Sequence, residues 1–199
     1  NLPQEPIQVA YRNRRVERNV PNDMLIMAFH IDSVTSPRFR GFDLLSSILS
    51  KGSSSRLIYQ LTKKRNIFTF VDAYVESQMD KGLLLIMGMP SSGVTIENAE
   101  VEIWKELDKL TKELVEEKEL QKVKNAEIST HIFGQVSLKE RATNLATFEL
   151  MGNVEQINIM EQSYEAVTAQ EIMELAKEIF KKERCSSLYY CAKKRDKNG

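Results

Sequence analysis

The chain has 199 residues, of which 42% are apolar and 28% are charged, a composition typical of one folded globular domain. Its 28 basic and 28 acidic residues give a formal net charge of zero, which argues against a nucleic-acid-binding protein because such proteins carry a basic excess. No apolar run reaches the roughly 18 residues that a membrane span needs. The first residues are polar and Pro-rich and indicate no signal peptide, and because the chain opens with Asn1 we expect a piece of something longer.

The first third of the chain predicts a linker, two strands and a helix. Residues 1–13 have no regular apolar pattern and are interpreted as a linker. Alternating polar and apolar residues predict a strand over 14–20, and the apolar run over 24–31 predicts a more buried strand. Ser36 and Pro37 mark a helix start, since Pro is tolerated in the first helical turn, and apolar residues then recur at helical spacing as far as Leu49.

A second helix and a hairpin follow. Gly52 and the serines after it interrupt the first helix, and Leu57 and Leu61 give the next helix a buried stripe. Asn66 follows three cationic residues and suits a left-handed helix cap. The runs 67–77 and 83–89 are separated by a turn-forming segment and predict an antiparallel hairpin.

The rest of the chain is predicted to be mainly helical. Apolar residues at helical spacing form one stripe and then a second, followed by a further helix over 138–151 and a capping box that begins at Thr168. The first stripe consists of Ala99, Ile103, Leu107, Leu110 and Leu114, and the second of Leu120, Val123, Ile128 and Ile132. The chain then closes with a strand over 185–192. Because the strands cluster in hairpins, we expect an α+β fold over 14–193, a mainly antiparallel sheet with helices packed on one face, and a tail over 194–199.

Side chains that could carry chemistry are few. His30 and His131 are the two histidines, and neither begins an H-x-x-E-H or H-E-x-x-H pattern, so we expect no metal ion and no cofactor bound by this chain. Cys185 and Cys191 lie six residues apart in one predicted strand, about 20 Å in an extended chain, which is too far for a disulfide. No base accompanies Cys191 or Ser54, which disfavours an independent nucleophilic enzyme.

The serines after Gly52 allow two interpretations. Ser53–Ser55 precede a predicted helix, so the simpler interpretation is that they cap it. The alternative is that free N–H groups at the helix start, together with Arg56, capture an anion or a carboxylate. The sequence favours the cap.

One run of residues resembles a known family. Residues 43–61, Asp-Leu-Leu-Ser-Ser-Ile-Leu-Ser-Lys-Gly-Ser-Ser-Ser-Arg-Leu-Ile-Tyr-Gln-Leu, are similar to the repeat signature of insulinase/pitrilysin-type zinc metallopeptidases, a helix, a Gly/Ser turn, Ser-Arg-Leu and a second helix. The strand from Ile67, the Glu-Leu-x-x-x-Lys pattern within 116–125 and Val167-Thr168 before the last helix also fit. The likeness covers nearly the whole chain and is closest to bacterial members described as zinc proteases.

The resemblance implies a role within a larger assembly. Members of this family fold as two similar halves, with a fold like that of mitochondrial processing peptidase, which close like a clamshell around a peptide. The N-terminal half carries H-x-x-E-H and zinc. This chain resembles the non-catalytic C-terminal half, so residues 1–13 would link it to a missing N-terminal half. Its expected partners are that half, or a separate chain carrying it, and a peptide substrate, and a homo-oligomer is also open.

The family pattern also implies candidate substrate contacts. In many members an Arg in the second helix and a Tyr seven residues later touch the substrate, and the matching positions here are Thr62 and Thr69. The expected contacts are therefore Ser54, Ser55, Arg56, Thr62 and Thr69, with no catalytic residue. The alternative is a scaffold or peptide-binding subunit without peptidase activity, since relatives of that kind are structural subunits of respiratory complexes. The resemblance is to bacterial proteins and does not distinguish a periplasmic location from a cytoplasmic one.

Overall fold

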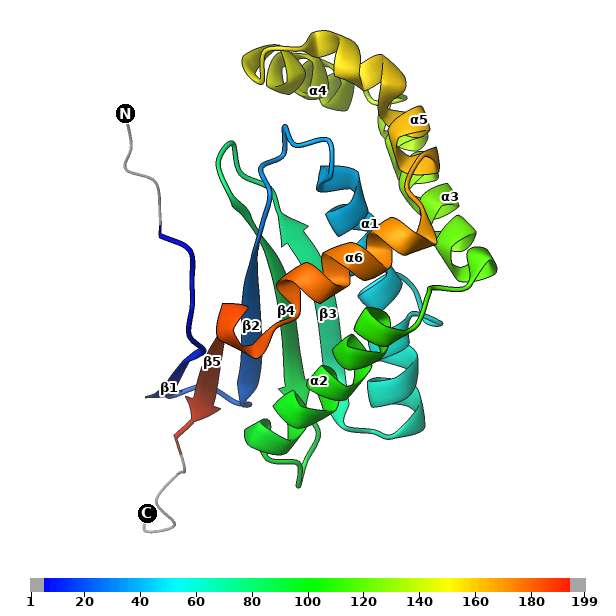
Figure 1. Ribbon diagram of the computed structural model, residues 1–199. Coiled ribbons are helices and arrows are strands. Elements are labelled where there is room, and N and C mark those ends of the chain that lie inside the picture. The colour runs from blue at the N-terminus through cyan, green and yellow to red at the C-terminus, as the bar shows by residue number, and fades with distance from the viewer. Residues whose placement is uncertain (1–5, 194–199) are drawn as a thin grey trace.

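The computed structural model describes residues 6–193, so residues 1–5 of the expected linker and the expected tail over 194–199 lie outside the described residues. The elements agree with the predicted order (Figure 1). They are β1 (Arg12–Arg18), β2 (Met24–Ile31), α1 (Phe39–Ser50), η1 (Ile58–Lys64), β3 (Phe68–Glu76), β4 (Gly82–Pro90), α2 (Ile96–Lys112), α3 (Glu117–Gly134), α4 (Leu138–Leu150), η2 (Val154–Ile159), α5 (Met160–Glu165), α6 (Ala169–Ile179), η3 (Lys182–Arg184) and β5 (Cys185–Ala192).

The strands form one five-stranded sheet in the order β1-β5-β2-β4-β3. The pairs β5–β2, β2–β4 and β4–β3 are antiparallel. The remaining pair, β1 with β5, is parallel. The expectation of an α+β fold with a mainly antiparallel sheet is therefore confirmed. The sequence did not predict that the first and last strands lie side by side.

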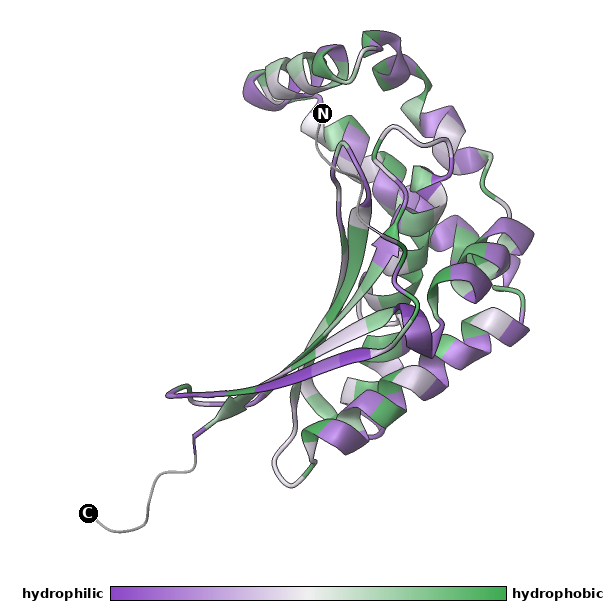
Figure 2. Ribbon diagram, turned by 60° about the vertical axis from the view of Figure 1, so that its left-hand side comes forward, coloured by the Kyte–Doolittle hydropathy of each residue, from purple (hydrophilic) through white to green (hydrophobic). Residues whose placement is uncertain are grey.

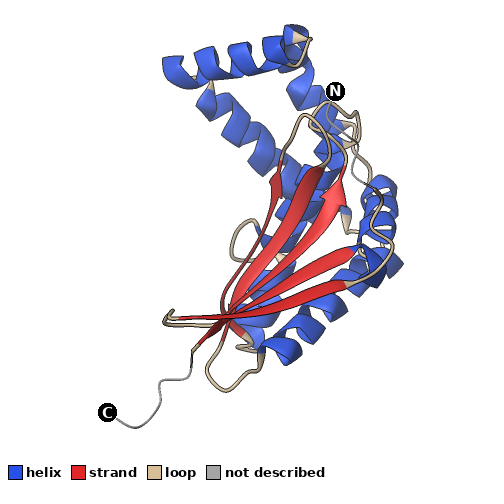
Figure 3. Cartoon of the chain, turned by 90° about the vertical axis from the view of Figure 1, so that its left-hand side faces the viewer, coloured by secondary structure: helices blue, strands red, loops and turns tan. Residues whose placement is uncertain are grey.

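The helices cover one face of the sheet, as predicted (Figure 3). Strands β2, β4 and β5 alternate regularly between buried and partly exposed residues, because successive side chains of a strand point to opposite faces. Phe29 of β2 lies in the core, with its ring centroid 5.7 Å from that of Trp104 and 5.2 Å from that of Phe180. The core therefore lies between the sheet and the layer formed by α1, α2 and α6.

Close packing of α1 and α6 depends on a glycine. A methyl group at Gly41 of α1 would lie 2.4 Å from the Cδ1 atom of Leu175 of α6, a distance too short for two carbon atoms. Without a side chain at position 41, the two helices can approach closely over the sheet.

Several predicted boundaries and burials need correction. The strand expected over 14–20 begins at Arg12. The helix expected after Ser55 is mainly a π-helix, and Leu57 just before it and Leu61 within it are both buried, as the stripe predicted. Leu114 and Ile132, assigned above to buried helix stripes, are about half exposed at 54% and 47%, because Leu114 lies beyond the end of α2 and Ile132 lies where α3 extends past the sheet.

The segment before β1 is attached to the domain. Gln8 is buried, and its Nε2 atom donates hydrogen bonds to the carbonyl oxygens of Cys185 at 2.8 Å and Ala10 at 3.0 Å. The described part of the expected linker thus packs beside the start of β5. A chain arriving from a preceding segment is therefore held against this sheet edge from Gln8 onward.

Candidate functional site: the bare face of the sheet

The second face of the sheet has no helix layer over it in the described part of the chain (Figures 2 and 3). The residues of β2, β4 and β5 on this face are partly exposed, and the two on β3 that are large and apolar, Phe70 and Tyr74, are 41% and 37% exposed. Strand register places these side chains next to one another. The adjacent members are Ile26, Ala28, Leu85, Met87, Met89, Leu188, Tyr190, Phe70 and Tyr74.

This face of the sheet carries a group of adjacent apolar side chains. Ile26 pairs with Met87 on one side and with Leu188 on the other, and Leu85 pairs with Tyr74. Directly paired residues on one face have their Cβ atoms about 5 Å apart. We refer below to the nine apolar residues just given as the bare face. Large exposed apolar patches occur at protein or membrane interaction sites and in ligand-binding grooves, which makes this face the candidate site.

The candidate residues Ser54 and Arg56 lie elsewhere, in a surface groove between η1 and the helices α2 and α3. This groove has a volume of about 580 Å³ and is lined by charged side chains. Arg56 donates from Nε and Nη2 to the two carboxylate oxygens of Glu119, at 3.0 and 2.8 Å, and Ser54 accepts from the Nζ atom of Lys122 at 3.0 Å. The paired charges of Arg56 and Glu119 join the turn after α1 to the start of α3.

The remaining candidates are dispersed. Ser55 is buried, and its hydroxyl donates to the carbonyl oxygen of Gly52 at 2.7 Å, so it closes the turn between α1 and η1. Thr62 lies in η1, and its buried Oγ1 atom has no hydrogen-bond partner among residues 6–193. Thr69 lies exposed at a register irregularity of β3 and donates to the carbonyl oxygen of Met89 at 3.2 Å. The five residues thus form no single cluster, and their substrate contacts stay a prediction.

The histidines lie on separate elements. His30 is on β2 and His131 is in the last turn of α3, where burial lowers the pKa of its imidazole. Within residues 6–193 no three side chains of the metal-ligating types gather around one point. A catalytic zinc needs three protein ligands, so the described residues do not provide a site for it.

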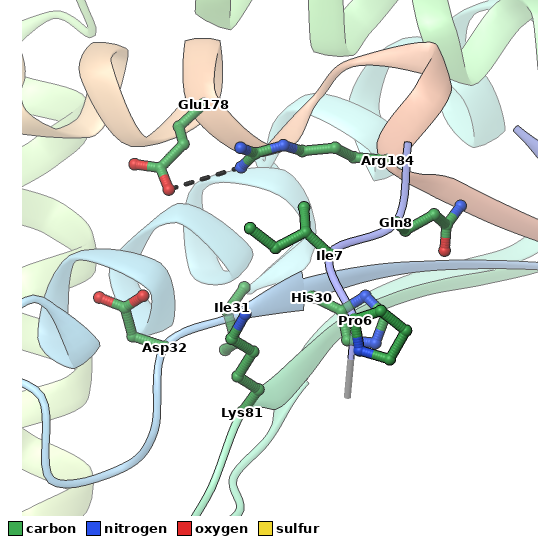
Figure 4. A pocket seen from close by; sticks show the side chains of 9 residues that line it. All are labelled: Pro6, Ile7, Gln8, His30, Ile31, Asp32, Lys81, Glu178 and Arg184. Carbon is green, nitrogen blue, oxygen red and sulfur yellow. Dashed lines mark hydrogen bonds and ion pairs between the residues drawn. The ribbon is translucent and has the colours of Figure 1, made fainter. Parts of the chain in front are cut away.

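A small pocket surrounds His30 at the start of the described chain (Figure 4). It has a volume of about 170 Å³ and lies between Pro6–Gln8, the end of β2 and the ion pair of Arg184 with Glu178, in which the Nη1 and Oε1 atoms are 3.5 Å apart. Figure 4 shows Pro6 beside His30. This pocket therefore lies where the N-terminal segment passes the end of β2, the central strand of the sheet.

The two cysteines are free and buried, as their spacing predicted. Burial raises the pKa of the Cys185 thiol to about 11. Burial also raises the pKa of Cys191, although the Nη1 atom of Arg15 lies 3.1 Å from its sulfur atom. Since the thiolate is the nucleophile, both thiols are poorly suited to covalent catalysis.

A second exposed apolar surface lies on the lobe formed by the end of α3, α4 and η2. The lobe extends past one end of the sheet (Figure 1), and Phe133 and Leu150 are 75% and 83% exposed. The other large apolar residues exposed on the lobe are Ile132, Val136, Leu138, Leu145 and Ile159. No helix within residues 6–193 is long and apolar enough to cross a membrane.

A buried carboxylate, which sequence reasoning missed, fixes the edge of the sheet that carries β1. Glu100 of α2 is 4% exposed. It accepts hydrogen bonds from Tyr11, Trp104, Lys182, Ser187 and Tyr189, with the distance from Lys182 Nζ being 2.9 Å. Burial alone would raise the pKa of Glu100, but the hydrogen bonds from Tyr189, Lys182, Trp104 and Ser187 together lower it. The segment before β1 is thereby tied to α2 and β5.

A family model matches the sequence of this chain, and solved structures match its fold. A family model described as the peptidase M16 inactive domain matches residues 1–127. Among curated proteins, none matches the chain. The chain is similar to the crystal structure of a protease from Helicobacter pylori, with a TM-score of 0.89 and 20% identity over 94% of this chain and 45% of that one.

Two further solved structures have a similar fold. An inactive peptidase domain from Bordetella parapertussis gives a TM-score of 0.82 and 16% identity, over 92% of this chain and 98% of that domain. A chain of Complex III2 from Candida albicans gives 0.78 and 15%, over 90% of this chain and 45% of that one. At these identities the likeness is one of fold, and this chain spans about half the length of the Helicobacter and Candida chains.

Proposed function

Because this chain belongs to the peptidase M16 inactive-domain family, we propose that it forms the non-catalytic wall of a peptide chamber whose zinc lies on a separate catalytic half. That half either precedes this chain in the same polypeptide or is a partner chain. The wall binds an extended peptide, orients it and excludes water from it. When zinc is present on the catalytic half, it activates the water that attacks the peptide bond.

The bare face carries this proposal. In an isolated globular domain, the solvent-facing side of an antiparallel sheet normally carries polar residues, which alternate along each strand with the apolar residues of the core side. Here the face away from the helices carries adjacent apolar residues on four strands, so leaving these residues in water costs free energy. At about 25 cal/mol per Å² of apolar area removed from water, a peptide laid on this face gains affinity without needing a catalytic side chain from it.

The apolar lobe supports a contact with the catalytic half. Phe133 and Leu150 are far more exposed than large apolar residues of a typical surface, and we propose that the catalytic half covers them. In the isolated chain the same surface favours self-association. Phe133→Ser and Leu150→Ser together are expected to shift the isolated chain toward monomer in sedimentation velocity, whereas Met79→Ser, which alters an exposed methionine of the turn between β3 and β4, is the matched control.

Peptide cleavage tests the proposed function. The chain is assayed with zinc, first alone and then together with the catalytic half that its gene or a neighbouring gene encodes, recognised by its H-x-x-E-H motif. Activity only after the two are combined supports the proposal. Activity of this chain alone would overturn it, and so would a catalytic half that reaches full activity without this chain.

A scaffold without peptidase activity is the second candidate, and the similarity to a chain of Complex III2 favours it. The two candidates differ in the half that accompanies this chain. A companion half without H-x-x-E-H, forming a stable complex that cleaves no peptide, would establish the scaffold.

A further inference from the structure

Arginine side chains border the bare face along the outer strand of the sheet. The register pairs Arg12 with Ser186 and Arg14 with Leu188, and paired residues of neighbouring strands point to the same side. Leu188 belongs to the bare face, so Arg12 and Arg14 project on that side. Arg15, between Arg14 and Val16, points to the helix side instead, where it contacts Glu97 of α2 and lies 5.3 Å from the centre of the Tyr189 ring.

Among the described residues, no acidic side chain is paired with these two arginines. Both are exposed, and within residues 6–193 neither forms an ion pair or a hydrogen bond through its side chain. Their partners on β5, Ser186 and Leu188, are uncharged. Arg18 lies on the same side and is paired with Ala192. The backbone nitrogen of Ala192 donates to the Oδ1 atom of Asp23, which places that carboxylate near Arg18. Arg18 therefore adds less positive charge to this edge than Arg12 and Arg14 do. Figure 2 shows β1 as a hydrophilic strand beside the more apolar ones.

The opposite edge of the bare face carries an acidic residue. On β3, Glu76 is exposed on this face. The Oδ1 atom of Asp72 instead accepts hydrogen bonds from Ser50 of α1 at 2.8 Å and from the backbone nitrogen of Ala73 at 2.9 Å, so this carboxylate is held at the strand edge by the helix layer. The apolar residues of β5, β2 and β4 lie between the two charged edges. The chain as a whole is neutral, so the positive edge is a local feature of β1 and does not reflect the overall charge.

We propose that the bare face selects extended peptides in which an apolar segment is followed or preceded by acidic residues, with the acidic residues lying against Arg12 and Arg14. This inference rests on the proposed function, that the face meets a peptide, and adds the class of peptide. The apolar residues of the bare face lie beside β1, mainly on β5, β2 and β4, so a peptide whose apolar segment lies on them reaches the arginines by crossing the strands. Arg12 and Arg14 are about 7 Å apart along β1. Acidic residues that leave the apolar segment therefore pass between two guanidinium groups, whose planar donors suit a carboxylate.

The test measures binding of labelled peptides to this chain by fluorescence anisotropy. Three 12-residue peptides share one length and label: an apolar segment followed by alternating Asp and Ser, the same segment followed by alternating Lys and Ser, and an acidic peptide without apolar residues. We expect the acidic apolar peptide to bind at least about tenfold more tightly than either of the others. The preference should weaken with added salt, because the Debye length falls from about 10 Å at 0.1 M to about 3 Å at 1 M.

Variants locate the effect. Arg12→Glu with Arg14→Glu should remove the preference or reverse it toward the basic peptide. Lys64→Glu with Lys139→Glu makes the same change in net charge at exposed positions on the helices and should leave the preference unchanged. Met87→Ser should weaken the acidic and the basic apolar peptides alike. Circular dichroism and the fluorescence of Trp104, the single tryptophan, establish that each variant is folded.

Each outcome either supports or overturns the inference. Equal affinity for the acidic and basic peptides would overturn the charge selection, and so would an equal effect of the Lys64 and Lys139 variant. Absence of binding by all three peptides would overturn the inference for this face. Cleavage by the combined halves could still be observed in that case, so failure here is distinct from failure of the proposed function.

Discussion

Replacing Glu100 with Gln tests the hydrogen-bond network that ties β1, α2 and β5 together. The carboxylate is 4% exposed and accepts from five side chains, one of them the cation of Lys182. Only the carboxylate of the Glu100–Lys182 pair is buried, since the Lys182 side chain is 51% exposed. Hydrogen bonds to a charged group contribute about 1.5–3 kcal/mol each, and an amide of the same shape retains part of this hydrogen bonding. We therefore expect Glu100→Gln to lower the free energy of unfolding by about 3 kcal/mol.

Urea unfolding followed by Trp104 fluorescence measures this change. Trp104 is the single tryptophan, and its Nε1 atom donates to Glu100 at 3.1 Å, so the emission also reports on the site itself. In a domain of this size about 3 kcal/mol corresponds to a fall in Tm of roughly 6–12 °C. Glu97→Gln is the matched control, because Glu97 lies one turn earlier on α2 in an exposed ion pair with Arg15, and such pairs contribute about 1 kcal/mol or less.

The effect of Glu100→Gln should depend on pH in a defined direction. The pKa of Glu100 is lowered in the folded chain from an ordinary value of 4.5, so the folded state binds the proton less tightly than the unfolded state does. The stabilisation is fully present above pH 4.5 and is lost as the pH falls through the lowered pKa. The gap between the native chain and Glu100→Gln should therefore narrow below pH 4.5.

Two results would refute this reasoning. A loss of under about 0.5 kcal/mol for Glu100→Gln would mean that the five donors find other acceptors or water at no cost. A gap that widens as the pH falls below 4.5 would mean that the folded pKa of Glu100 lies above its unfolded value.

Three further predictions concern other parts of the domain. Burial raises the pKa of Asp43, which also accepts a hydrogen bond from Tyr164, so its ionisation opposes folding as the pH rises above 3.8; Asp43→Asn should be more stable than the native chain at pH 7 and equally stable below pH 3.8 in thermal unfolding. Asn66 has a positive φ of 49°, so Asn66→Ala should cost about 1 kcal/mol in urea unfolding while Asn66→Gly costs little, and equal effects would contradict the backbone argument. The Arg56–Glu119 pair, with side chains 17% and 21% exposed, should show a coupling energy of about 1 kcal/mol in a double-mutant cycle with Ala at both positions, and a coupling near zero would free Arg56 for another role.

Local structure was largely predictable from the sequence. The last strand was predicted over 185–192 and is observed over Cys185–Ala192, because strict alternation between two faces leaves little freedom of assignment. Thr168 was predicted to cap α6, and its hydroxyl accepts from the backbone nitrogen of Glu171 at 3.1 Å. Asn66 was predicted to be left-handed and is. Each of these features depends on residues within a few positions of one another.

Features that depend on distant residues were missed. Nothing near residues 12–18 indicates that they pair with β5, more than 160 positions later. Glu100 follows Ala99 of the predicted stripe and looks like an exposed position of α2 in the sequence, and its partners come from residues 11, 182, 187 and 189. Leu57 and Leu61 are four residues apart, a spacing that suits an α-turn as well as a π-turn. The bare face was likewise invisible, since alternation shows which residues share a face but not whether that face is covered.

The pairing of the first strand with the last determines how the domain responds to mechanical force. β1 and β5 are parallel, and they adjoin residues 6–11 and Lys193 respectively. Tension applied at residues 6 and 193 therefore pulls the two strands in opposite directions along their length and loads their hydrogen bonds together instead of one after another. A pull on either end of the described chain is transmitted through this pair as a shear, and single-molecule stretching should show one abrupt rupture at high force in place of gradual peeling.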